Sequence, residues 1–170
     1  MSGSVDSTTP SAKCGRRRRS MCAERSEPHD REIVTTRHFA VTRERLFEAW
    51  ISPARLARWW GPSDFTNTFE TFDPRPGGEW RFVMHGPDGT DYENRSIFVE
   101  IVHPERIVFD HVSDHRFRVV ATFDVEGNGT RLTFRMTFET ADEAAKVAST
   151  VTETNEQNFD RLEQELGLTD

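Results

Sequence analysis

Residues 117–166 read FRVVATFDVEGNGTRLTFRMTFETADEAAKVASTVTETNEQNFDRLEQEL, and this stretch decides the fold. In its first half, apolar and polar residues alternate with a period of two on both sides of the turn at 126–129. The alternation predicts two antiparallel strands, at about 117–125 and 130–138, each with one buried face. From 141 to 166 the chain has neither Pro nor Gly, and its apolar residues recur at helical spacing. We therefore expect a long C-terminal helix that packs its apolar stripe on the sheet.

Further strands precede this hairpin. Turn signals rich in Pro, Gly, Asp and Asn separate runs of aromatic and β-branched residues, which predicts strands at about 32–41, 65–73, 78–86, 92–102 and 106–112. The sheet then has seven strands, mostly antiparallel. The side chains expected to face the core are Trp80, Phe82 and Met84 in one strand, Phe117, Val119, Ala121, Phe123 and Val125 in a second, and Leu132, Phe134, Met136 and Phe138 in a third.

Two short helices are expected between the first and second strands. Thr42 suits the N-cap of a helix whose apolar positions run from Leu46 to Ile51. Pro53 disfavours helix before it and suits a first helical position. A second helix is therefore predicted from Pro53 to Trp60.

The composition limits the class of protein. The 170 residues suffice for one domain with a sizeable core, and no run of about 18 apolar residues suggests a membrane span. The only cysteines, Cys14 and Cys22, precede residue 31, so the rest of the chain has no disulfide or thiolate site. This fits a cytoplasmic protein. Residues 31–170 carry sixteen Lys and Arg against twenty-five Asp and Glu, so a general electrostatic affinity for nucleic acid is not expected.

Residues 1–30 are rich in Ser, Thr, Pro and charge and show no apolar period. We expect a disordered polar tail there, followed by a single domain at 31–168. The run Arg16–Arg19 would suit a nucleic-acid-binding arm or a twin-arginine export signal. Export needs an apolar stretch after the arginines, and residues 20–25 are not apolar. A solvated tail is the preferred interpretation.

The long helix has a polar run on its apolar side. Its apolar positions are Ala144, Ala148, Val151, Phe159, Leu162 and Leu166, but no residue of 152–158 is apolar. Helical spacing puts Asn155 and Asn158 near the stripe, and polar groups that face a core need partners. Two interpretations stay open. Either these residues face a pocket that holds water or a ligand, or the helix rolls slightly and they lie at a wet edge.

The order of one strand, two short helices, six strands and a long helix resembles the START/SRPBCC superfamily, the Bet v 1-like or helix-grip proteins. Particular segments resemble the subfamily named after the activator of the heat-shock protein 90 ATPase: Leu46–Trp50, Trp59–Pro62, Asp73–Trp80, Gly86–Gly89, Tyr92–Arg95, Glu100–Val108 and Gln157–Leu162. The resemblance covers about 32–166. It implies an α+β fold in which a seven-stranded antiparallel sheet curves around the C-terminal helix and encloses a pocket. The family usually has a small residue where Thr154 and Asn155 stand, so the cavity is expected to be narrower here.

The resemblance implies a small soluble protein that binds a small hydrophobic or amphipathic ligand, without a cofactor. The residues expected to line its pocket are Trp60, Trp80, Met84, Tyr92, His111, Phe134, Met136, Asn155 and Phe159. We expect a monomer or homodimer, with no nucleic-acid or membrane partner. No residue is assigned a catalytic role.

Two rival functions remain open. One is an enzyme resembling polyketide cyclases and dehydratases, acting on an aromatic substrate with Tyr92, His111 or Glu100 as acid or base. The other is a co-chaperone or stress-response interaction protein. The eukaryotic activators resembled here pair this domain with a separate N-terminal chaperone-binding module, and this chain has only the polar tail at that place, which disfavours the co-chaperone.

A metal site is not expected. Asp110, His111, Asp114 and His115 lie close together in the sequence. Strand alternation sends Asp110 and His111 to opposite faces, however, and a turn follows. The spacing matches no compact set of metal ligands.

Overall fold

The computed structural model describes residues 28–169, and the tail prediction for the segment before residue 28 lies outside them. The described chain begins with a single 3-10 turn, η1 (Pro28–Arg31). The elements that follow are β1 (Glu32–Phe39), α1 (Arg43–Ile51), α2 (Pro53–Trp59), β2 (Thr66–Phe72), β3 (Glu79–His85), β4 (Asp91–Val102), β5 (Arg106–His111), β6 (Phe117–Glu126), β7 (Gly129–Phe138) and α3 (Ala141–Glu165). Every predicted helix and strand is present, with ends that differ by one or two residues.

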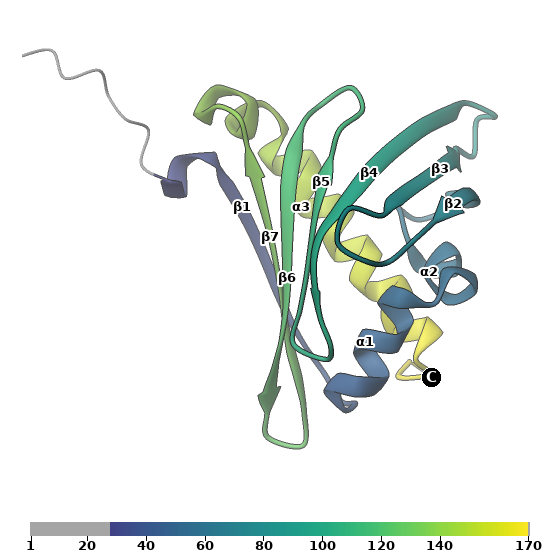
Figure 1. The fold of residues 1–170 in the computed structure, drawn as a ribbon, viewed down its shortest axis with the longest axis vertical. Coiled ribbons are helices and arrows are strands. Elements are labelled where there is room, and N and C mark those ends of the chain that lie inside the picture. The colour runs from purple at the N-terminus through teal and green to yellow at the C-terminus, as the bar shows by residue number, and fades with distance from the viewer. Residues whose placement is uncertain (1–27, 170) are drawn as a thin grey trace, which may run out of the picture.

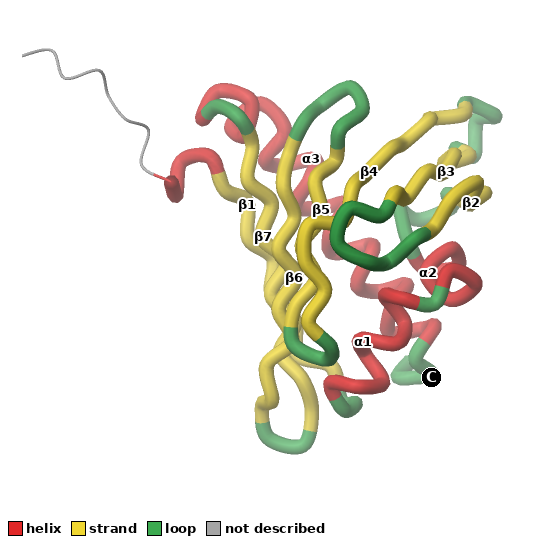
Figure 2. Tube along the Cα trace, viewed as in Figure 1, coloured by secondary structure: helices red, strands yellow, loops and turns green. Residues whose placement is uncertain are grey.

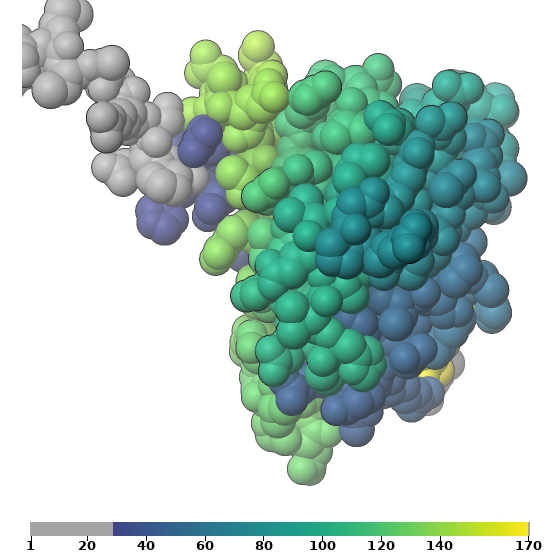
Figure 3. Space-filling view, in the orientation of Figure 1, coloured from purple at the N-terminus to yellow at the C-terminus, as the bar shows by residue number. Residues whose placement is uncertain are grey.

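The seven strands form one antiparallel sheet in the order β1-β7-β6-β5-β4-β3-β2. The last strand, β7, pairs with the first, β1, and β1 and β2 are the two edge strands. The sheet is strongly curved, and α3 runs across one of its faces (Figure 1). Irregular registers in β2, between Phe69 and Thr71, and in β4, between Phe98 and Glu100, add bends. In the space-filling view the strands cover much of the face turned to the viewer, α1 and α2 lie at its lower right, and α3 is visible mainly at the upper left rim (Figure 3). This is the helix-grip architecture that was predicted.

The helices α1 and α2 close one end of the concave face, next to β2 and the C-terminus (Figure 2). Thr42 caps α1, because its hydroxyl accepts a hydrogen bond from the Arg45 amide. Pro53 occupies the first turn of α2, as its fixed backbone angle favours. The Trp59 indole donates to the Ala49 carbonyl at 2.9 Å, which joins the two helices through a buried hydrogen bond. Among the described residues, no helix is both long enough and apolar enough to cross a membrane.

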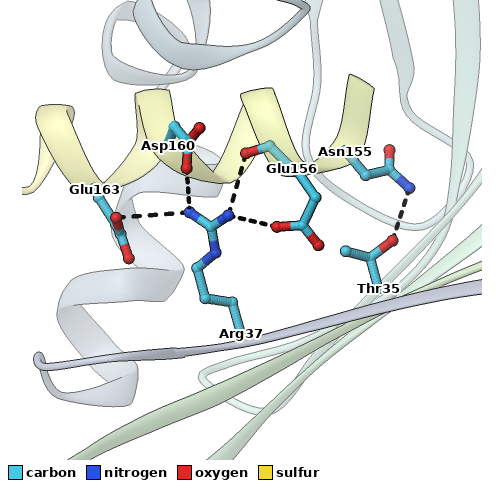
Figure 4. A network of polar contacts seen from close by, with 6 residues as sticks. All are labelled: Thr35, Arg37, Asn155, Glu156, Asp160 and Glu163. Atoms are coloured by element: carbon cyan, nitrogen blue, oxygen red, sulfur yellow. Dashed lines mark hydrogen bonds and ion pairs between the residues drawn. The ribbon is translucent and has the colours of Figure 1, made fainter. Parts of the chain in front are cut away.

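An arginine on the inner face of β1 fastens α3 to the sheet (Figure 4). The Arg37 guanidinium contacts the carboxylates of Glu156 and Asp160 at 2.5 and 2.7 Å, and that of Glu163 at 3.6 Å. Burial acts to lower the pKa of Arg37, but the hydrogen bonds and the three negative charges outweigh it and raise that pKa. The guanidinium also lies 5.6 Å from the centre of the Phe159 ring. Arg37 therefore contacts both the carboxylates on α3 and a buried aromatic ring of the core.

One residue departs from the predicted inward face. Val125, at the end of β6, is 67% exposed rather than part of the core. It pairs with Thr130 next to the turn between β6 and β7. In Figure 1 the tip of this hairpin extends beyond α1 and α2, in keeping with the exposure of Val125. Alternation gives the direction of a side chain but not whether another layer reaches it.

Candidate functional site

A cavity of about 290 Å³ lies between the inner face of the sheet and α3. Most of its wall is apolar and aromatic. Trp80 and Met84 come from β3, Phe134 and Met136 from β7, and Trp60 from the segment that follows α2. Such a wall with a small number of polar groups is the usual form of a small-molecule site.

The register of the central strands brings the polar groups of the wall together. Met84 pairs with Tyr92, and Trp80 pairs with Ser96, across β3 and β4. Ser96 in turn pairs with His111 across β4 and β5. Because paired residues point to the same face of a sheet, these side chains share the concave side. Tyr92 and Ser96 of β4 and His111 of β5 thus form a polar row in an otherwise apolar wall.

The mouth of the cavity lies where the polar row reaches solvent. Tyr92 is 48% exposed, and Asp114 and His115, in the turn between β5 and β6, are also exposed, although all three contribute to the lining. On the other side the rim is formed by Val151 and Thr154 of α3, which are half-buried. The cavity therefore opens between the β5–β6 turn and α3.

Eight of the nine residues expected to line a pocket are brought to this cavity: Trp60, Trp80, Met84, Tyr92, His111, Phe134, Met136 and Asn155. Phe159 is not among the lining residues. It is buried between Phe39 and Phe134, with ring centres 5.9 and 6.1 Å away. Phe159 follows Asn158 by one helical position, and this rotation places its ring against Phe39 and Phe134 rather than in the cavity lining. That the eight residues bind a ligand remains a prediction.

His111 has hydrogen-bonding partners on both ring nitrogens. Nδ1 lies 2.8 Å from the His115 carbonyl oxygen, which only accepts, so Nδ1 carries a hydrogen. Nε2 lies 3.0 Å from the side-chain oxygen of Asn94 and 3.3 Å from the Ser113 hydroxyl. The neutral ring can accept from Ser113, and the protonated ring can donate to Asn94. The imidazole also stacks on Phe117, with the ring centres 4.6 Å apart.

The burial of His111 affects its protonation. Burial lowers the pKa of His111, against the opposing effects of the hydrogen bond to His115 and the charge of Asp114. The ring is therefore neutral near pH 7. A neutral imidazole at a cavity wall can orient a ligand or exchange a proton with it.

Asn155 and Asn158 are both buried, at 4% and 5% exposed, so the wet-edge interpretation is wrong for both. The Asn155 amide donates to the Thr35 hydroxyl at 3.1 Å and lies 3.6 Å from the Met136 sulfur. Both asparagines line the cavity. The Asn158 side-chain oxygen accepts from the Gly61 amide, so this residue also holds backbone.

Residues of α3 fix the segment that follows α2. The Arg161 guanidinium donates to the carbonyls of Trp60, Gly61 and Pro62 at 3.0–3.1 Å, and to that of Arg58 at 2.7 Å. Burial lowers the pKa of Arg161, partly offset by the negative charge of Asp64. Gly61 has φ of +101°, and a Cβ atom there would lie 2.6 Å from the end of the Met84 side chain. The cavity wall at this point thus depends on glycine.

Several polar lining residues were not predicted, among them Asn94, Ser96 and Asp114. Asn94 and Ser96 follow Tyr92 at steps of two along β4, so alternation from Tyr92 points to them. Asp114 belongs to a turn and has φ of +47°, which no strand pattern indicates. Whether a turn residue lines a site depends on the conformation of the turn, and the periodicity of the flanking strands does not predict that conformation.

A profile of the family described as "Activator of Hsp90 ATPase homolog 1-like protein" matches residues 40–167. The chain belongs to this family. No curated protein matches it in sequence. The structure is similar to that of an Arthrobacter aurescens protein, which is 25% identical with a TM-score of 0.77 over 84% of this chain and 90% of that one.

Two more solved structures are similar to this chain. The AHSA1 protein from Silicibacter pomeroyi is 26% identical, with a TM-score of 0.67 over 81% of this chain and 98% of that chain. A Nitrosomonas europaea protein, 20% identical with a TM-score of 0.75 over 82% and 96%, shows the shared fold alone. The SRPBCC helix-grip fold is thus common to the family and to this chain.

The position of Glu100 does not fit the acid–base role considered for it. Glu100 is not among the residues lining the cavity of this AHSA1-like protein, and its carboxylate binds Arg106 of the neighbouring strand. Asp110 points away from His111 and forms a two-fold contact with Arg118. Within residues 28–169 no three His, Cys, Asp or Glu side chains group as metal ligands.

A hydroxyl, an imidazole and a carboxylate also line up outside the cavity. Thr68 Oγ1 lies 2.8 Å from His85 Nε2, and His85 Nδ1 lies 2.6 Å from the Asp91 carboxylate. Spacing of this kind can activate a nucleophile. Here, however, the three residues lie on the outer face of β2, β3 and β4, and Thr68 and Asp91 are exposed. We interpret them as a surface hydrogen-bond series.

Proposed function

We propose that this AHSA1-like protein binds a small apolar or amphipathic molecule in the cavity between the sheet and α3. The observation that supports this most directly is the cavity itself, about 290 Å³ with an apolar wall and one polar row that leads to its mouth. Well-packed interiors leave few voids larger than a water molecule. A space of this size in a core rich in aromatic rings is therefore better explained by a ligand than by imperfect packing.

Filling the cavity tests this proposal. Met136 is buried, lines the cavity and contacts Asn155, so Met136→Trp would place its added volume in the open space. We expect the variant to fold and to lose the binding of apolar dyes and aromatic ketones, which raise the melting temperature of the wild type by mass action. In a closed core the same change would cost ~1–3 kcal/mol of stability through overpacking.

Thr133→Trp is the matched control, because Thr133 lies on the same strand and is offset from Met136 by an odd number of residues, so it faces outward. It should leave binding intact. The proposal fails if the wild type binds none of the probes while Met136→Trp is strongly destabilised. The interior would then be closed, and the function would lie on the surface.

An enzymatic function on an aromatic substrate is a second candidate, and one observation favours it. His111 lies at the cavity wall beside Asn94, with its Nδ1 hydrogen held by the His115 carbonyl and Nε2 turned to neighbouring side chains. A positioned neutral imidazole suits general acid–base catalysis. Under this proposal His111→Gln abolishes turnover of a bound aromatic ketone or polyketide-like compound without abolishing its binding. Binding without any turnover by the wild type would exclude this candidate for that substrate.

A further inference from the structure

Two polar groups on the cavity wall have no hydrogen-bond partner within residues 28–169. Ser96 is 1% exposed, and its hydroxyl is unpaired. Trp80 is also 1% exposed, and its indole N–H has no acceptor. The two residues are directly paired across β3 and β4, and both line the cavity. Buried polar groups are rarely left without a partner, so this pair needs an explanation.

Ser96 is the more informative of the two. The Trp80 ring lies among the rings of Phe69, Phe72 and Phe109, at centre-to-centre distances of 5.6, 5.9 and 5.5 Å. A ring face is a weak acceptor for an N–H group, which accounts for Trp80 in part. The Ser96 hydroxyl can both donate and accept, and among the described residues it has no hydrogen-bond partner. If one ligand atom bonds to both Trp80 and Ser96, that atom must be an acceptor, because an indole nitrogen only donates.

The charges around the cavity favour a neutral partner. Among the described residues that line it, none is Lys or Arg, while the carboxylate of Asp114 lies at its mouth. His111 is the basic group of the polar row, and burial lowers the pKa of its imidazole. A carboxylate ligand would give up its hydration in the cavity without gaining a cation. An uncharged oxygen acceptor gives up much less.

The size of the cavity limits the ligand. A volume of about 290 Å³ lies at the lower end of the ~300–1,000 Å³ found for small-molecule sites. A compact molecule with two fused rings is therefore an appropriate probe.

We propose that the cavity selects a neutral, compact, ring-containing ligand whose carbonyl oxygen accepts a hydrogen bond from Ser96 and a second from Trp80. This inference rests on the proposed function. It adds a ligand class, and it assigns the specificity for the carbonyl to a serine that has no hydrogen-bond partner within residues 28–169.

Three probes of nearly equal size test the assignment: methyl naphthyl ketone, naphthoate and isopropylnaphthalene. Their affinities are measured by thermal shift and calorimetry with the wild type and with Ser96→Ala. This substitution removes only an unpaired hydroxyl, so the fold should keep its stability. Ser149→Ala, on the exposed side of α3, is the control.

We expect the wild type to bind the ketone roughly three- to tenfold more tightly than the hydrocarbon, and more tightly than naphthoate. Ser96→Ala should remove this advantage and leave the affinity for isopropylnaphthalene unchanged. If naphthoate binds as well as the ketone, or if Ser96→Ala keeps the advantage, the carbonyl assignment is wrong while the binding function stands. If none of the three binds, the proposed function fails together with the assignment.

Discussion

Asn158 allows a sharp test of how α3 holds the wall of the cavity. Its side-chain oxygen accepts from the Gly61 amide, and both residues are buried. Asn158→Ala would leave this N–H group without an acceptor, while Arg161 still binds the carbonyls around it and holds the segment in place. Because the Gly61 amide is buried, we expect it to bear much of its desolvation cost.

That cost is ~1–3 kcal/mol for a buried donor left unpaired. Alanine favours the helix over asparagine by up to ~0.7 kcal/mol, which offsets part of it. A net loss of about 1–2 kcal/mol is expected. For a chain of this size, each kcal/mol lowers the melting temperature by roughly 2–4 °C, which gives a decrease of about 2–8 °C.

Gln157→Ala is the matched control. Its side-chain oxygen accepts from the Ser63 amide at 3.0 Å, so the chemistry and the helix are the same. Ser63 is exposed, however, and water can satisfy its amide. The loss should stay within about 0.5 kcal/mol, as at other surface positions.

Urea denaturation followed by circular dichroism measures both free energies of unfolding, and thermal melts check them. Equal losses for the two variants would refute the reasoning, because burial is the main difference between the two contacts. A loss below about 0.5 kcal/mol for Asn158→Ala would show that the Gly61 amide finds another acceptor.

Two other predictions follow from burial. Leu162 is fully buried under the sheet, so Leu162→Ala should cost ~2–5 kcal/mol in urea denaturation, and a loss under about 0.5 kcal/mol would contradict the assigned helix face. Burial lowers the pKa of His111, so the unfolded chain binds this proton more readily and stability should fall as the pH drops below about 6.5. His111→Gln should make the melting temperature less dependent on pH between about 7.5 and 5; equal slopes for His111→Gln and the wild type would contradict this.

Most of the fold is predictable because its signals are local. The turns between strands are marked by Gly, Pro, Asn and Asp, and the strand periods between them are clean. The position of Thr42 before α1 and of Pro53 in α2 follows from backbone chemistry alone. Val125 was misplaced because its burial depends on which elements reach the hairpin tip, and this is a property of the assembled layers.

The site was predictable in part for the same reason. Residues on inward strand faces, such as Trp80, Met84 and Met136, follow from alternation once the fold is known. The predicted place of Phe159 in the pocket does not match the observed lining, because helical phase drifts along a long helix. A rotation of one residue is enough to turn a side chain away from the cavity. The sequence also does not show whether Asn158 meets a ligand or a backbone amide, because its partner Gly61 lies about a hundred residues away.

The aromatic cluster and the cavity occupy the same interior, and each constrains the other. Trp50, Trp59 and Trp60 pack with ring centres 4.9–5.9 Å apart where α1 and α2 close the sheet. Large rings bury much apolar area per residue, so this end can supply a large share of the stability. The end toward the β5–β6 turn can then leave a space unfilled without unfolding the domain. Trp60 belongs to both regions, because it packs in the cluster and lines the cavity. Substitutions at Trp60 should therefore alter stability and binding together, whereas Ser96 and Met136 allow the two to be separated.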